Sequence, residues 1–172
     1  AIVLAETAGW ETDLGRHVAV LAQLSGLMHD ICRLQGEHAK QGAELSFRIL
    51  RDYPVTSQDK DMIAFAIANH EAFKANRSAP DFQTDLLNGA LYDADKFRWG
   101  PDNFVTTLWE ICDYLEWPLG KIHERFPQGL DVVRSIADTF RTRTGQIYGP
   151  EFIDIGLELG GYLYRRMEQV IQ

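Results

Sequence analysis

Apolar positions near the start of the chain recur at helical spacing, at Leu14, Val18, Leu21, Leu24, Leu27 and Met28. Because an α-helix completes a turn in about 3.6 residues, this spacing places the side chains on one face. The pattern predicts a helix ending at Met28, with Thr12 or Asp13 as its N-cap. The segment AIVLAET reads as the later part of another apolar helix, and we expect its front to precede Ala1.

The next two predicted helices each carry a histidine on the apolar face. His38 shares its face with Gly42, Leu45 and Ile49, and this helix should stop near Tyr53-Pro54. A cap-rich segment at 56–59 then begins a helix whose apolar stripe contains Ile63, Ala66, Ile67 and His70. Both histidines are therefore expected to face the interior of the protein.

The remaining pattern is also helical. A polar loop over 74–80 precedes a helix that leads to Asp95, and Asp93 lies on a neighbouring stripe, so spacing does not choose between the two aspartates. Further helices are predicted over 103–117, 130–144 and 151–172, with breaks at 118–120, 127–129 and 145–150. No alternating run is long enough to indicate a strand. We predict an all-α protein, a single helical bundle over residues 1–172.

Composition narrows the class of protein. A chain of 172 residues with 45% hydrophobic content suits one globular domain. The net charge of −8 and the lack of a basic run argue against partners such as nucleic acid polymers or anionic membranes. No apolar run approaches the roughly 20 residues of a membrane span. Cys32 and Cys112 make no disulfide framework, which favours the cytoplasm.

His29 and Asp30 stand side by side at the end of the first predicted helix. An unpaired buried carboxylate costs several kcal/mol, and a divalent metal satisfies an imidazole and a carboxylate together. The simpler interpretation is a histidine that interacts with the helix dipole. Ordinary structural roles are assigned to His17 and His123. Imidazole and carboxylate ligands without thiolates favour Fe, Mn, Co, Ni, Zn or Mg.

The ordered set of His29-Asp30, His38 in EHAKQGAEL, His70 in IANHEA and Asp95 in DADKFRW resembles the HD-domain superfamily of metal-dependent phosphohydrolases. The resemblance covers about residues 1–99 and leaves 100–172 as a variable helical remainder. It implies one divalent metal on His29, Asp30 and Asp95, with Asp93 as the alternate. It further implies a second metal on His38 and His70, with Asp30 bridging the two.

One ligand of the family pattern is not found at its usual place. The family has an earlier histidine on the preceding helix, whereas His17 stands twelve residues before His29 on the same predicted helix. Twelve residues span about 18 Å of helix, too far for one ion. The missing ligand is therefore expected before Ala1, or else this protein has lost it.

The resemblance implies hydrolysis of a nucleotide or other small phosphorylated substrate. Asp30 would hold the nucleophilic water between the metals, and Arg33 and Lys96 would meet phosphate oxygens. Weaker candidates for the rim of the site are Lys74, Arg77 and Arg98.

Two other classes stay open. The same ligands occur in di-iron oxygenases that resemble HD domains, such as myo-inositol oxygenase. A non-catalytic domain that senses a ligand is the third possibility, and a homo-oligomer is compatible with the sequence.

Overall fold

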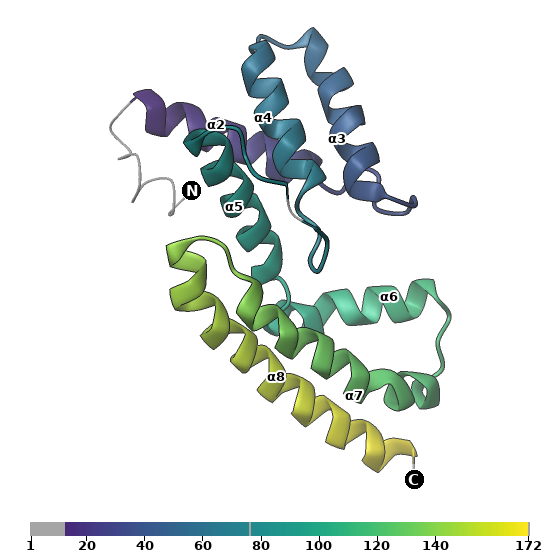
Figure 1. The fold of residues 1–172 in the computed structure, drawn as a ribbon. Coiled ribbons are helices and arrows are strands. Elements are labelled where there is room, and N and C mark those ends of the chain that lie inside the picture. The colour runs from purple at the N-terminus through teal and green to yellow at the C-terminus, as the bar shows by residue number, and fades with distance from the viewer. Residues whose placement is uncertain (1–12, 76, 172) are drawn as a thin grey trace. The chain divides into compact units, whose positions relative to one another are not determined.

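The computed structural model describes residues 13–75 and 77–171, and every regular element in these ranges is a helix (Figure 1). This confirms the predicted all-α fold class. No helix within these ranges combines the length and the apolar character needed to cross a bilayer. The helices are α2 (Asp13–Met28), α3 (His38–Ile49), α4 (Ser57–Ala68), α5 (Phe82–Phe97), α6 (Leu108–Tyr114), α7 (Leu119–Ile136) and α8 (Arg143–Ile171), with shorter turns at Leu50–Asp52, Asn103–Thr107 and Ala137–Thr139.

The chain forms two compact units. The first contains the described part of Ala1–Ala94 together with Arg141–Arg143, and the second contains Asp95–Phe140 and the described part of Thr144–Gln172. The boundary falls within α5, a few residues before the border at residue 99 that the sequence suggested. Each unit has its own buried residues.

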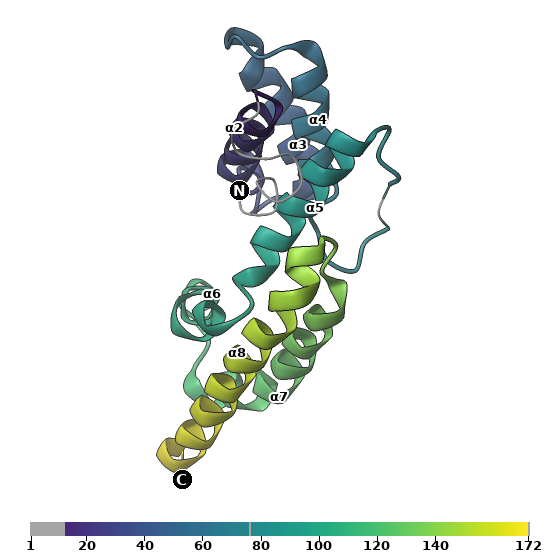
Figure 2. The same cartoon turned by 90° about the vertical axis from the view of Figure 1, so that its left-hand side faces the viewer.

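In the first unit, α3 and α4 run side by side in opposite directions, and α2 packs against α4 (Figure 1, Figure 2). The predicted end at Met28 is confirmed. The helix α3 ends at Ile49, and the short turn over Leu50–Asp52 continues it to the predicted stop near Tyr53-Pro54. The predicted cap segment begins α4, where Thr56 Oγ1 accepts a hydrogen bond from the Asp59 backbone N–H at 3.1 Å. The predicted helix AIVLAET and Thr12 lie outside the described residues. The core consists of Leu21, Met28, Ala43, Leu50, Met62, Ile63, Ala66, Ile67, Leu87 and Leu91.

The predicted break at 127–129 is wrong, because α7 runs through it with Pro127 inside. Proline removes one backbone donor and costs a helix interior about 3 kcal/mol. The buried residues of α7 lie on one face and continue across the proline, at Ile122, Phe126, Val133 and Ile136. Burial contributes about 1.5–3 kcal/mol for each large apolar side chain, which outweighs the proline.

The predicted break at 145–150 and the predicted helix over 130–144 are also wrong. The helix α8 begins at Arg143 and contains Pro150, and its buried stripe includes four glycines, at 145, 149, 156 and 160. A Cβ on Gly156 would lie 2.6 Å from the carbonyl carbon of Gly100, and one on Gly149 would overlap the Phe140 ring. These glycines serve close packing within the second unit, whereas the sequence pattern resembled a loop.

Candidate metal centre

Three segments of the first unit carry the predicted imidazoles. His29 and Asp30 begin the turn after α2, His38 is the first residue of α3, and His70 follows the end of α4. The turn is closed by the Arg33 N–H, which donates to the Asp30 carbonyl at 2.9 Å. Gly42 allows this turn to approach α3, since a Cβ there would lie 3.2 Å from the His29 carbonyl oxygen.

The carboxylate of Asp30 lies among the three imidazoles. Its Oδ2 is 3.5 Å from His29 Nε2. Its Oδ1 is 3.5 Å from His70 Nε2 and 3.8 Å from His38 Nε2. The His70 ring stands nearly edge-on to both others, with ring centroids 5.1 Å from His29 and 5.2 Å from His38. One oxygen thus faces His29 and the other faces His38 and His70.

Backbone carbonyls fix the tautomers of two of these rings. His29 Nδ1 lies 2.8 Å from the Gly26 carbonyl oxygen, and His70 Nδ1 lies 2.6 Å from the Ile67 carbonyl oxygen. A carbonyl only accepts, so each neutral ring donates through Nδ1 and directs the lone pair of Nε2 toward Asp30. Among the described residues, Asp30 Oδ1 is buried and receives no hydrogen bond. Lone pairs therefore face one another in this cluster.

The donor set fits a divalent cation. Atoms of His29, Asp30 and His70 lie within 4.8 Å of one another, a spacing that could hold a metal. Two ligand atoms about 2.1 Å from one ion at a tetrahedral angle are roughly 3.4 Å apart, close to the separations from Asp30 to these two rings. A metal-bound histidine commonly donates its other ring N–H to a carbonyl, as both rings do here.

Asp30 is held in its ionised form. Burial raises the pKa of its carboxyl group, but His70 and His29, which attract the carboxylate when their rings are protonated, and the Arg33 guanidinium together outweigh burial and leave the pKa lowered. Arg33 donates directly to Asp30 Oδ2, while just over half of its side chain stays exposed. The carboxylate is thus available as a ligand at neutral pH, with a guanidinium at the edge of the cluster.

Glu71 is a member of the site that the sequence interpretation missed. Its Oε1 lies 3.7 Å from His38 Nδ1, so His38 has a carboxylate at both ring nitrogens. The signal was its position directly after His70, but a single glutamate next to a histidine is too common to select.

The predicted Asp95 and Lys96 belong to the second unit. Lys96 Nζ donates to Asp95 Oδ2 at 2.5 Å, and its side chain is only 4% exposed. Lys96 is therefore a buried partner of Asp95 in this structure, and its predicted contact with phosphate stays a prediction. Of the rim candidates, Arg98 pairs with Asp102 at 3.7 Å in the same unit, and Lys74 is exposed in the loop before α5.

The alternate aspartate, Asp93, has a different role. Its Oδ1 accepts the Arg141 backbone N–H at 2.8 Å, and its Oδ2 accepts the Thr142 backbone N–H at 2.8 Å and the Thr142 hydroxyl. These hydrogen bonds attach the segment before α8 to α5. Because both oxygens are already used, Asp93 is poorly placed to bind a metal.

The other two histidines lie elsewhere. His17 Nε2 pairs with Asp59 Oδ1 at 2.8 Å, which joins α2 to α4. His123 stacks on Tyr164 in the second unit, with ring centroids 4.6 Å apart. Cys32 and Cys112 are both free and buried.

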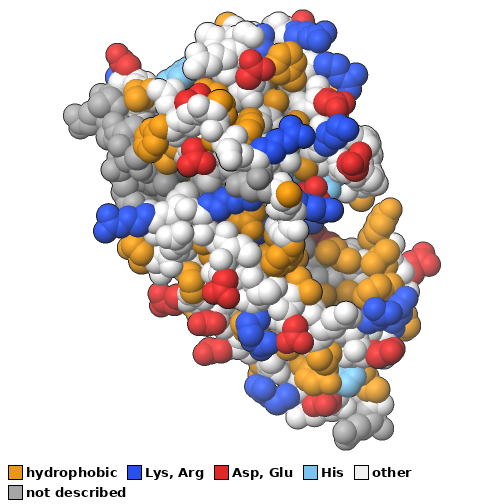
Figure 3. All heavy atoms as spheres, viewed as in Figure 1, with side chains coloured by type: hydrophobic (Ala, Val, Ile, Leu, Met, Phe, Trp, Pro, Cys, Tyr) orange, Lys and Arg blue, Asp and Glu red, His pale blue; other side chains and the backbone are white. Residues whose placement is uncertain are grey.

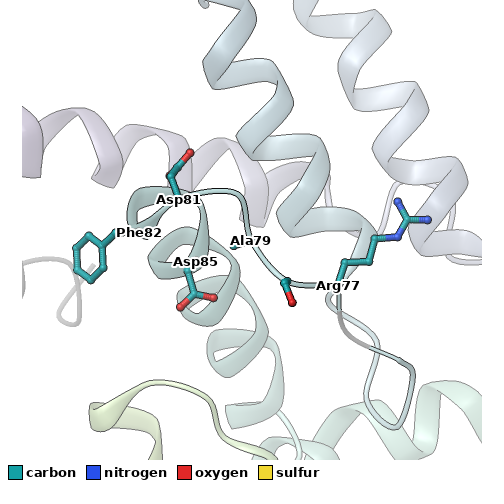
Figure 4. A pocket seen from close by; sticks show the side chains of 6 residues that line it. Arg77, Ala79, Asp81, Phe82 and Asp85 are labelled. Carbon is teal, nitrogen blue, oxygen red and sulfur yellow. The ribbon is translucent and has the colours of Figure 1, made fainter.

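A hollow at the start of α5 offers no comparable arrangement. It is lined by Arg77, Ser78, Ala79, Asp81, Phe82 and Asp85. Figure 4 shows the side chains of Asp81, Phe82 and Asp85 pointing in different directions, with Arg77 directed away from both aspartates. The cluster around Asp30 is thus the stronger candidate. Comparisons of the chain with protein-family models, with curated proteins and with solved structures returned no match.

Proposed function

We propose that this protein is a metal-dependent phosphohydrolase of the HD-domain type, acting on a nucleotide or other small phosphorylated compound. One observation carries the proposal: Asp30 directs one oxygen toward His29 and the other toward His38 and His70. A carboxylate in this position suits a bridge between two cations, one on each side.

The proposed ligands divide along the Asp30 carboxylate. His29 and Oδ2 of Asp30 would hold one divalent ion, and His38, His70 and Oδ1 of Asp30 would hold the other. The further ligand that the family resemblance implies, Asp95, stays a prediction. The Gly26 and Ile67 carbonyls support this assignment, because they keep His29 and His70 in the tautomer that binds metal through Nε2. Glu71 would orient His38 in the same way. Bound divalent cations lower the pKa of water to near neutrality and neutralise phosphate charge.

Arg33 favours a phosphorylated substrate over the oxygenase alternative, which would share the same ligands. Its guanidinium is anchored to Asp30 and partly exposed, so it can donate to a phosphate oxygen while staying beside the carboxylate.

The test compares two histidine variants on the same metal assay. Protein purified without chelators or a metal-affinity tag is expected to hold at least one of Mn, Fe, Co or Zn per chain, directly or after reconstitution. His70→Gln should lose most of that metal. His17→Gln is the matched control and should keep the metal, because His17 pairs with Asp59 and is not one of the proposed ligands.

Activity is measured on a panel of nucleotides and sugar phosphates under nitrogen with Mn or Co. Phosphate release that disappears in Asp30→Asn supports the proposal. Turnover that requires iron and air would assign the protein to the oxygenases, and no metal under any condition would leave a non-catalytic helical domain.

A further inference from the structure

A groove lies along α3 and α4. Its volume of about 860 Å³ is in the range of small-molecule sites. Small side chains form part of its floor, at Ala43, Ala64 and Ala68, and leave space between the two helices.

The groove is separate from the Asp30 cluster. On α3 and the turn that follows it, the lining residues recur at 40, 43, 44, 47, 48 and 51, which is one helical stripe. His38 lies on the stripe that continues through Gly42 and Leu45. Because each residue turns the helix by about 100°, the groove stripe is on roughly the opposite side of α3 from His38.

The groove is basic although the whole chain is acidic. Lys40, Arg48, Arg51 and Arg77 line it, against two acidic residues, Glu44 and Asp61. Within the described part of the chain, none of the four basic side chains forms an ion pair. Figure 3 shows several Lys and Arg side chains over α3 and α4, next to apolar atoms and with Asp and Glu side chains between them. A chain with a net charge of −8 thus concentrates unpaired positive charge at one hollow.

Two aromatic rings complete the lining. Phe47 comes from α3 and Phe65 from α4, and both are only partly buried. Partly exposed phenylalanines beside cations offer a flat apolar surface and charge partners to the same ligand. Base stacking on such rings and phosphate binding by arginine are the usual contacts of nucleotides with proteins.

We propose that the α3–α4 groove binds a nucleoside phosphate, with the phosphates on Arg48 and Arg51 and the base against Phe47 and Phe65. Lys40 and Arg77 extend the positive field at the end of the groove that includes Asn69, the residue before His70. This site is independent of the proposed metal centre, and nucleotide binding in the groove does not require bound metal.

The experiment is calorimetric titration of the full chain in EDTA with three probes: ATP, tripolyphosphate and adenosine. ATP should bind at least tenfold more tightly than either of the others, because only ATP uses both the cations and the rings. The double variant Arg48→Gln/Arg51→Gln should weaken ATP binding at least tenfold, and Phe65→Leu at least threefold. Arg125→Gln, an exposed arginine on α7, is the matched control and should leave it unchanged.

A further arm separates this site from the metal centre. Asp30→Asn should bind ATP as the unchanged protein does. ATP binding that is lost in Asp30→Asn and kept in Arg48→Gln/Arg51→Gln would overturn the proposal and place the nucleotide at the metal centre. Equal binding of ATP and tripolyphosphate would overturn the role of the rings, and no ATP binding at millimolar concentration would overturn the site as a whole.

Discussion

At the scale of single residues, Asp93 and Asp30 show opposite environments for a carboxylate. Asp93 is buried and accepts backbone N–H groups of Arg141 and Thr142 on its two oxygens. Asp30 Oδ1 receives no hydrogen bond from the described residues, yet imidazole nitrogens surround it. A satisfied carboxylate contributes to stability, whereas an unsatisfied one in a set of metal donors is available for binding.

Asp93→Asn should therefore lower the stability of the protein and leave its metal content unchanged. The asparagine NH2 would face a backbone donor, so one hydrogen bond becomes a repulsive contact and the others lose their charge. We expect the free energy of unfolding in urea to fall by about 2–3 kcal/mol. Asp85→Asn, an exposed position on the same helix, should change it by less than about 0.5 kcal/mol. An Asp93→Asn protein of full stability but reduced metal content would reverse the roles assigned to Asp93 and Asp95.

The pair of His17 and Asp59 should appear in the pH dependence of stability. Burial raises the pKa of Asp59, but hydrogen bonds from Thr56 and His17 outweigh it and leave the pKa lowered. A lowered folded-state pKa adds stability that is fully present above the unfolded value of about 3.9 and is lost as pH falls further. Urea unfolding at pH 5 and pH 3 should thus show a stability gap between the unchanged protein and Asp59→Asn that narrows at pH 3. A gap that widens would contradict this sign.

At the scale of elements, α7 and α8 show how burial along one face overrides local helix breakers. Both contain a proline, and α8 also has a glycine-rich buried stripe. In isolation such segments would favour turns. In the second unit, the stripe brings the α8 backbone against Gly100 and aromatic rings, at distances that no other residue allows.

Two glycines of α8 should respond in opposite ways to alanine. A Cβ on Gly156 would meet the Gly100 backbone, which cannot move cheaply, so Gly156→Ala should destabilise the protein by about 1–3 kcal/mol. The nearest atom to a Cβ on Gly161 is the flexible end of Arg165, 3.6 Å away. Gly161→Ala should instead stabilise by about 0.5–1 kcal/mol, since alanine favours helix. Equal effects in thermal unfolding would show that close packing does not explain the stripe.

At the scale of the whole molecule, the first unit is completed by a segment far along the chain. Arg141 Nη1 donates to the Asn69 carbonyl at 3.0 Å, and its guanidinium lies 3.6 Å from the centre of the Tyr92 ring. Asn69 precedes His70, so this arginine supports the backbone that carries a proposed metal ligand. The unit that holds the candidate site thus depends on residues 141–143.

Arg141→Gln should accordingly affect both stability and metal binding. Loss of the hydrogen bond and of the cation–π contact is expected to cost about 2 kcal/mol of unfolding free energy. Metal affinity should fall with it, because the Asn69-His70 backbone loses its anchor. The control is Arg143→Gln, exposed at the start of α8, which should alter neither quantity. If Arg141→Gln lowers stability but leaves metal affinity unchanged, the arginine is structural only.

The sequence by itself determined the fold class and the ends of several helices. The apolar spacing that leads to Met28 reflects local helical periodicity, which the order of residues along the chain shows directly. It also selected His29, Asp30, His38 and His70, because each interrupts an apolar stripe at a helix end. For the same reason Asp93 and Asp95 could not be separated: both lie on helical stripes, and only a contact with Arg141 and Thr142 distinguishes them.

Only the tertiary structure decided what depends on distant partners. The continuity of α7 and α8 through Pro127 and Pro150 follows from burial against other helices, which local propensity does not contain. The direction of each Asp30 oxygen, the approach of Glu71 to His38 and the basic groove between α3 and α4 all depend on how separate helices pack together. Periodicity reports which face of a helix is buried, whereas packing alone selects the residues that this face contacts.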